Sequence, residues 1–157
     1  MIHSMRSLAL AAAIVLPLGP YDIQLQNTPR TPNAQGSARL LFAESPFGIA
    51  VTADGHASYD VRFTISGLPE PSTLGAYTTW VAWGVTPDLK QWRRLGAVGN
   101  GDTTVGRVEF NKFMLVVAAE SDSLVTKHAG PIALSGTSPS GWLQTFLSHP
   151  LFRGVAP

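Results

Sequence analysis

Apolar and polar residues alternate over much of the middle of the chain. From Tyr59 to Ile65 every second side chain is apolar, and those between are polar or charged. Successive side chains of a β-strand point to opposite faces, so this pattern predicts a strand with one buried face. Residues 47–51 alternate in the same way, and Asp54-Gly55 between the two stretches is typical of a type I′ hairpin turn.

Similar patterns recur at short intervals from Ser37 to Gly136. They predict further strands at residues 38–44, 76–86, 92–98, 104–110, 113–121 and 131–135. Stretches rich in Gly, Pro, Asn and Asp separate these segments, and no long helical pattern lies among them. The predicted fold class for residues 37–136 is therefore all-β, an Ig-like antiparallel β-sandwich of about 7–8 strands.

The chain begins with a short apolar run behind a positively charged flank. Arg6 precedes an apolar stretch from Leu8 to Leu18, a pattern typical of an export signal. As a helix this stretch measures about 16 Å, which is short of the ~30 Å hydrocarbon core of a bilayer. No A-x-A motif follows this stretch, where Gly19 and Pro20 stand instead, so residues 1–19 are interpreted as a signal peptide or, slightly favoured, a retained short membrane anchor. The residues expected to contact the membrane are Leu8, Leu10, Ile14, Val15, Leu16 and Leu18.

Two further segments flank the predicted sandwich. Residues 20–36 are rich in Pro, Asn, Gln and Thr and predict an extended linker. Ser138-Pro139 suits the start of a helix, and apolar side chains follow at helical spacing, so residues 137–157 predict a short helix and a tail. We expect this segment to dock onto a partner subunit or the membrane interface; the alternative is that it closes one end of its own sandwich. The candidate interface residues are Trp92, Trp142, Phe146, Leu147, Leu151 and Phe152.

The composition narrows the classes of function. Charged residues make up 13% of the chain, against about 25% in ordinary soluble domains. Such a surface is covered by small polar residues, by a partner or by lipid. The net charge is +1 and no stretch is strongly basic, which argues against nucleic-acid binding. The absence of cysteine excludes disulfides, Cys-ligated zinc and thiolate nucleophiles.

Candidate chemical groups are sparse. The histidines are too far apart in the sequence for any two to share a local metal-binding face: His3, His56, His128 and His149. The stretch that begins at Gly136 resembles a G-x-S-x-G nucleophile elbow, but Ser140 stands in place of the final Gly. Pro139 also lacks the backbone N–H that an oxyanion hole would use. The sequence therefore predicts no catalytic residue, no metal site and no cofactor.

Two tryptophans of one predicted strand pose a packing problem. Trp80 and Trp83 fall on opposite faces of the strand at residues 76–86. A single core cannot bury both faces. We therefore expect one tryptophan in the core and the other under a loop, the tail or a partner.

A series of short motifs extends over roughly residues 76–136. The motif residues are Tyr77 and Trp80, then Leu95-Gly96, then Glu120 at the end of a strand, then Gly130-Pro131 and Gly136. This series resembles the extracytoplasmic domain of the anti-sigma-K-factor family. The resemblance implies a small Ig-like sandwich outside the membrane. Residues 1–36 leave no room for the cytoplasmic sigma-binding region of that family, so the resemblance does not imply sigma-factor control.

These features predict a non-catalytic structural or interaction subunit, and not an enzyme. It would lie on the periplasmic side of a bacterial membrane and brace a larger membrane complex, such as a respiratory or photosynthetic assembly. Its partners would be protein subunits of that complex and, through the N-terminal segment, the membrane itself. The alternative is a secreted periplasmic module that binds a small ligand or a metal.

Overall fold

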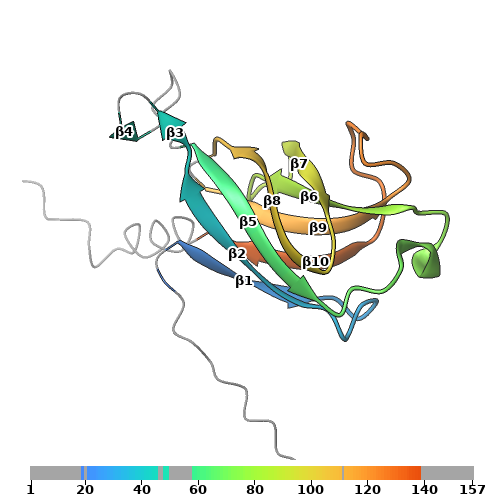
Figure 1. Cartoon of the computed structure of the whole chain (residues 1–157). Helices are drawn as coiled ribbons and strands as arrows, with labels where there is room; N and C mark the ends of the chain where they lie inside the picture. The colour runs from blue at the N-terminus through green and yellow to red at the C-terminus, as the bar shows by residue number, and fades with distance from the viewer. Residues whose placement is uncertain (1–18, 20, 46–47, 50–57, 111, 139–157) are drawn as a thin grey trace, which may run out of the picture.

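The structure is a computed structural model that describes residues 19, 21–45, 48–49, 58–110 and 112–138. Within these ranges the chain forms β-strands and one short 3-10 helix, η1 (Pro71–Leu74) (Figure 1). The strands are β1 (Asp22–Asn27), β2 (Gln35–Phe42), β3 (Glu44–Ser45), β4 (Gly48–Ile49), β5 (Tyr59–Ser66), β6 (Thr79–Val85), β7 (Trp92–Val98), β8 (Gly101–Val108), β9 (Met114–Glu120) and β10 (Ile132–Thr137). The predicted all-β antiparallel class is confirmed.

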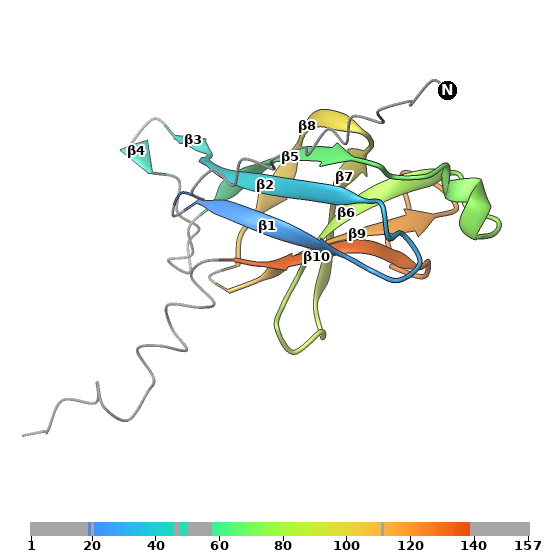
Figure 2. The ribbon, with the colours of Figure 1, turned by 90° about the horizontal axis from the view of Figure 1, so that it is seen from below.

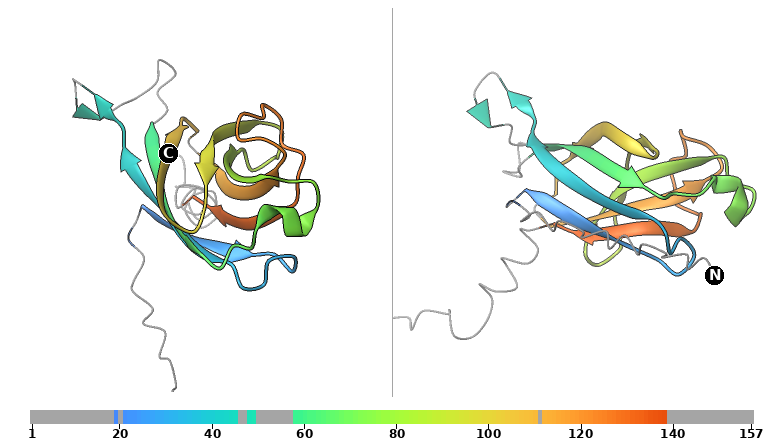
Figure 3. Two further views of the ribbon diagram at one scale, coloured as in Figure 1. Left: turned by 45° about the vertical axis from the view of Figure 1, so that its right-hand side comes forward. Right: turned by 60° about the horizontal axis from the view of Figure 1, so that its bottom comes forward.

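Eight strands form one antiparallel sheet in the order β7-β6-β9-β10-β1-β2-β5-β8, and β3 pairs with β4 in a separate hairpin. The sheet curls around on itself into a nearly closed barrel (Figure 3). Strand β1 joins the two halves, because its residues 22–25 pair with β2 and its residues 26–27 pair with β10 (Figure 2).

The two edge strands of the sheet, β7 and β8, come close together. A Cβ atom on Gly106 would lie 2.8 Å from the carbonyl oxygen of Leu95, so only glycine allows this approach. Nearby, Arg93 Nη1 lies 2.7 Å from Glu109 Oε2. Backbone proximity and an ion pair thus hold the barrel nearly shut.

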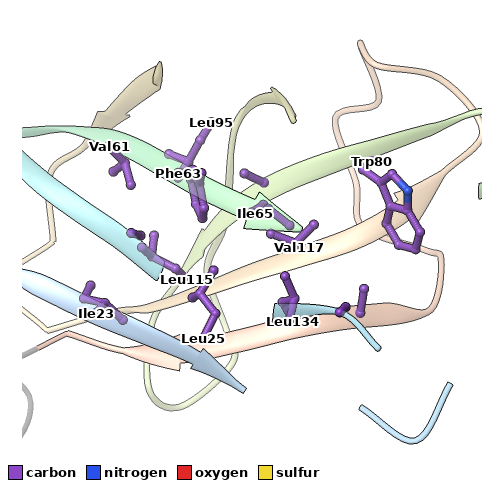
Figure 4. Packing of buried hydrophobic residues seen from close by; sticks show 14 of the residues in the cluster. Ile23, Leu25, Val61, Phe63, Ile65, Trp80, Leu95, Leu115, Val117 and Leu134 are labelled. Atoms are coloured by element: carbon purple, nitrogen blue, oxygen red, sulfur yellow. The ribbon is translucent and has the colours of Figure 1, made fainter. Parts of the chain in front are cut away.

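The inward-facing side chains of both halves form one apolar core. Phe63, Leu115 and Leu134 are fully buried and come from β5, β9 and β10. Figure 4 shows these side chains pointing toward one another across the barrel. Trp80 closes one side of this core at 4% exposure, and its Nε1 donates a hydrogen bond to the carbonyl of Pro69. The alternation read from the sequence at Tyr59–Ile65 is the inward and outward alternation of β5.

A second, smaller apolar cluster lies on the outer face of β6 and β9. It contains Trp83, Val81 and Val116, and partly buried Trp92 and Val125 pack against it. Val125 belongs to the loop between β9 and β10. The expectation that one tryptophan of β6 enters the core and the other lies under a loop is confirmed.

Part of the linker predicted for residues 20–36 is a structural strand instead. Residues 22–27 form β1, and β2 begins at Gln35. Ile23 and Leu25 are buried and alternate with polar neighbours, so the two-residue period of a strand was present there too. The prolines at 29 and 32 interrupt only the loop after β1, where Thr31 is buried and donates to the carbonyl of Ala133.

Several predicted elements lie outside the described residues. These are the N-terminal apolar helix, the Asp54-Gly55 turn and the C-terminal helix beyond Ser138. Among the helices of the described ranges, none has the length and apolar character needed to cross a membrane.

Candidate functional site

The barrel has two ends that differ in character. At the near end β1 begins and β10 ends; at the far end β1 ends, β9 ends and β10 begins. In Figure 1 the near end lies on the left, beside β3 and β4, and the far end on the right, beside η1. Each end carries a cluster of side chains that do not belong to the buried apolar core.

A buried carboxylate lies at the far end. Glu120 is the last residue of β9 and points to the outer face, as Val116 and Ala118 do, and it is 1% exposed. Its Oε1 lies 2.9 Å from His128 Nδ1, and the N–H of Ala129 donates weakly to both carboxylate oxygens at 3.4 Å. A buried carboxylate is stable only when hydrogen-bonded, so the loop between β9 and β10 folds back to supply these partners.

Two tryptophans hold the ring of His128. The ring stacks on Trp92 with centroids 4.2 Å apart and planes 6° from parallel, and it meets Trp83 edge-on at 5.9 Å. Trp92 is fixed in turn, because its Nε1 donates to the carbonyl of Leu89 at 3.0 Å. An ionised carboxylate only accepts hydrogen bonds, so Nδ1 is the donor of this pair when Glu120 is ionised. The second ring nitrogen, Nε2, makes no hydrogen bond to a described residue.

His128 also lines a shallow groove of about 590 Å³ at the far end. The other lining residues are 28–30 of the β1–β2 loop, Tyr77, and residues 129–132. Gly130 allows these walls to meet, because a Cβ there would lie 1.6 Å from the carbonyl oxygen of Ala119 and 3.0 Å from the Tyr77 ring. The groove therefore combines the guanidinium of Arg30, the imidazole of His128 and the phenol of Tyr77 with apolar walls.

The residues that carry the family resemblance divide between core and groove. Tyr77, Gly130 and Pro131 line the groove, and Glu120 lies beneath its histidine. Trp80 packs in the core, and Gly136 lies under β1, where a Cβ would be 2.6 Å from the carbonyl oxygen of Gln24. One half of the motif series thus shapes the barrel and the other half shapes its far end.

Trp83 has an unusual indole. Its side chain is fully buried, and its Nε1 is a buried polar atom without a hydrogen-bond partner among the described residues. An unpaired buried donor costs about 1–3 kcal/mol. Trp92 and His128 make edge-on contacts with this indole.

The near end carries three neighbouring aromatic rings. Tyr21 and Phe42 meet edge-on at 5.1 Å, and Phe42 lies 5.3 Å from Tyr59. Tyr21 and Phe42 are each 43% exposed, whereas Tyr59 is partly buried. Burial raises the pKa of the Tyr59 phenol, and neighbouring Tyr21 raises it further. We call these three residues the aromatic cluster.

Asp22 fixes the start of the barrel beside the aromatic cluster. It makes a two-point ion pair with Arg39, with Nε–Oδ1 at 2.7 Å and Nη2–Oδ2 at 3.2 Å. The backbone N–H of Gly19 also donates to Asp22 Oδ2 at 2.9 Å. The hydrogen bond from Arg39, and next that from Gly19, hold the pKa of Asp22 below its usual value.

Of the predicted interface and membrane residues, Trp92 is the one within the described ranges. It lies over the outer cluster and stacks on His128, so much of its ring covers the molecule itself. The tail residues Trp142, Phe146, Leu147, Leu151 and Phe152, and the membrane residues Leu8, Leu10, Ile14, Val15, Leu16 and Leu18, lie outside the described residues. Their roles stay predictions.

The pairing of His128 with Glu120 was not predicted from the sequence. Short spacings between histidines carry no signal for it, because the partner is a carboxylate eight residues away. No three His, Asp or Glu side chains of the described ranges gather as metal ligands. The hydroxyl of Thr28 in the groove already donates to the carbonyl of Ile132 at 2.8 Å. The arrangement is suited to binding through hydrogen bonds and charge.

Comparisons with known proteins give no relative from which a function could be inferred. No family model, no curated protein and no solved structure matches this chain.

Proposed function

We propose that this protein is a non-catalytic structural or interaction subunit on the periplasmic side of a bacterial membrane. It braces a larger membrane complex, for example a respiratory or photosynthetic assembly, and it attaches through the near end of its barrel. The observation that carries the proposal is the exposed aromatic cluster of Tyr21, Phe42 and Tyr59 at that end.

The aromatic cluster continues the inner face of the barrel beyond the core. Phe42 follows Ala38 and Leu40 on the inward row of β2, and Tyr59 precedes Val61 on that of β5. In register, Phe42 and Tyr59 are direct partners. Single exposed apolar residues are ordinary on a protein surface, but adjoining aromatic rings are typical of an interface.

The predicted attachment segments adjoin the same end. The predicted anchor over residues 1–19 precedes Tyr21, and the predicted tail follows β10, which ends at Thr137 beside the start of β1. Membrane anchor, aromatic cluster and tail would then face one partner together. The low charge content of 13% supports a surface that is partly covered in its working state.

We also propose that the fold is a variant of the Ig-like sandwich, in keeping with the resemblance to the extracytoplasmic domain of the anti-sigma-K-factor family. Without β5 the strand order would read β7-β6-β9-β10 in one layer and β1-β2-β8 in the other. This is a seven-strand sandwich with four and three strands in its layers. Strand β5, inserted between β2 and β8, is the addition.

Co-purification from detergent-solubilised membranes tests the attachment. The full chain and the variant Leu124→Ser, which changes a residue that is 71% exposed on the β9–β10 loop, should each retain a stoichiometric partner. Phe42→Ser should lose that partner with at most a small fall in melting temperature, because its side chain lies outside the buried core and is 43% exposed. A wild-type chain that purifies as a free monomer would contradict the proposal, and so would a partner retained by Phe42→Ser.

A further inference from the structure

The far-end groove presents a histidine whose position is fixed before any ligand arrives. Glu120 is hydrogen-bonded to Nδ1 and Trp92 stacks on the ring. Nε2 is therefore the ring nitrogen without a partner among the described residues. The side chain of His128 is 19% exposed, and that of Glu120 is 2% exposed. Apolar residues could have joined the loop to the sheet without the desolvation cost of a carboxylate. A buried Glu–His pair at a groove therefore points to use of the imidazole.

Arg30 gives the same groove an uncompensated positive charge. Among the described arginines, Arg39, Arg62, Arg93 and Arg107 each contact a carboxylate, and Arg94 donates to the carbonyl of Ser123. Arg30 has no such partner within the described residues. The described lining of the groove also contains no Asp or Glu, and Glu120, which adjoins it, is buried at 2% exposure and hydrogen-bonded to His128. An anion entering the groove would therefore meet Arg30 with no acidic side chain among the lining residues.

The remaining walls of the groove are apolar or aromatic. Pro29, Pro131 and Ile132 line it together with the ring of Tyr77. Its volume of about 590 Å³ falls within the roughly 300–1,000 Å³ usual for small-molecule sites. A ligand matched to these walls carries an apolar body beside its negative charge.

We propose that this groove binds a carboxylate that bears an apolar or aromatic group. Arg30 pairs with the carboxylate, and the prolines and Tyr77 contact the apolar body. With a proton on both ring nitrogens, His128 donates to Glu120 from Nδ1 and to the ligand carboxylate from Nε2. Guanidinium groups match carboxylates well because their N–H groups form a planar fork. The site is separate from the aromatic cluster and does not depend on the attachment proposed for the near end.

Titration of the full chain with benzoate, followed by NMR, tests the site. Benzoate should shift the signals of His128 and Ile132 saturably, whereas benzamide, which has the same shape and no charge, should shift them at least tenfold more weakly. A short peptide ending in Phe with a free carboxylate, compared with its C-terminal amide, distinguishes the source of the ligand. Tighter binding of the free peptide than of benzoate indicates a protein C-terminus, and the reverse indicates a free organic acid.

Charge-matched variants complete the test. Arg30→Gln should weaken binding of the carboxylates at least tenfold and keep the melting temperature, because Arg30 is exposed and makes no bond to a described residue. Arg107→Gln, which removes another exposed positive charge, from β8, should bind as the wild type does. Equal binding of benzamide and benzoate would overturn the proposal. So would unchanged binding by Arg30→Gln, or no saturable binding of either carboxylate.

Discussion

Aromatic rings are exposed at the near end of the barrel and covered on its outer face. At the near end Tyr21 and Phe42 are each 43% exposed, and their neighbours are other rings. On the outer face Trp83 is fully buried, because Trp92 of β7 and His128, which the β9–β10 loop brings back from the far end, cover it. The same kind of side chain is therefore exposed where no loop returns and covered where the far-end loop folds back.

The difference follows from where polar partners are available. The loop between β9 and β10 can fold over apolar surface because Glu120 bonds both the side chain of His128 and the backbone of Ala129. Among the described residues of the near end, Asp22 bonds Arg39 and Gly19 and leaves the rings uncovered. We infer that the apolar side chains near the far end are covered in the isolated barrel, whereas the exposed rings of the near end are covered when the protein associates with its partner.

Removal of the carboxylate at the far end should have the largest effect on stability. Glu120→Ala leaves the N–H groups of His128 and Ala129 without their acceptor, which should cost about 1–3 kcal/mol. The His128 ring should also leave Trp92, which changes tryptophan fluorescence. Urea unfolding measures the first effect and the emission spectrum of the folded variant the second.

Glu120→Gln is the matched control, because its amide oxygen can still accept a hydrogen bond from Nδ1. It should lose less stability than Glu120→Ala and keep the fluorescence of the wild type. If Glu120→Ala is as stable as the wild type and fluoresces identically, the far end does not depend on this pair, and the contrast between the ends fails.

Loss of the carboxylate at the near end should have a smaller, pH-dependent effect. The folded-state pKa of Asp22 is lowered by Arg39 and Gly19, whereas the unfolded value is about 3.9. The stabilisation is therefore complete well above the unfolded-state value and is lost as the pH falls through the folded-state value. Asp22→Asn should be less stable than the wild type at pH 6, and the two should converge as the pH falls through the folded-state pKa of Asp22.

Thermal melts of both chains between pH 2 and pH 7 measure this convergence. Because the ion pair is partly exposed, with Arg39 at 64% side-chain exposure, added salt should shrink the difference at pH 6. A difference that stays constant down to pH 2 would show that the charge of Asp22 contributes nothing.

The sequence predicted the repetitive part of the fold better than its sites. Strand β5 was predicted because its inward residues recur at every second position, and Trp80 and Trp83 were correctly divided between two faces. Strand β1 was missed because flanking prolines outweighed the short alternation of Ile23 and Leu25. Prolines that lie only in a loop do not prevent the residues beside that loop from forming a strand.

Neither end could be identified from local spacing. Tyr21, Phe42 and Tyr59 come from three separate strands or turns and meet only when β1, β2 and β5 pair. The groove likewise joins Arg30 to His128 across the barrel's far end. Such sites follow from strand order, and strand order was not predicted from the sequence.

Site-specific photo-crosslinking in intact cells tests the central claim, attachment through the near end, most directly. A photoreactive phenylalanine analogue placed at Phe42 should give one discrete crosslinked product with a membrane-complex subunit, and the same analogue at Leu124 should give none. Both positions are exposed in the isolated barrel, so accessibility alone cannot produce this difference. Crosslinking of equal yield at both positions, or at Leu124 alone, would contradict the account.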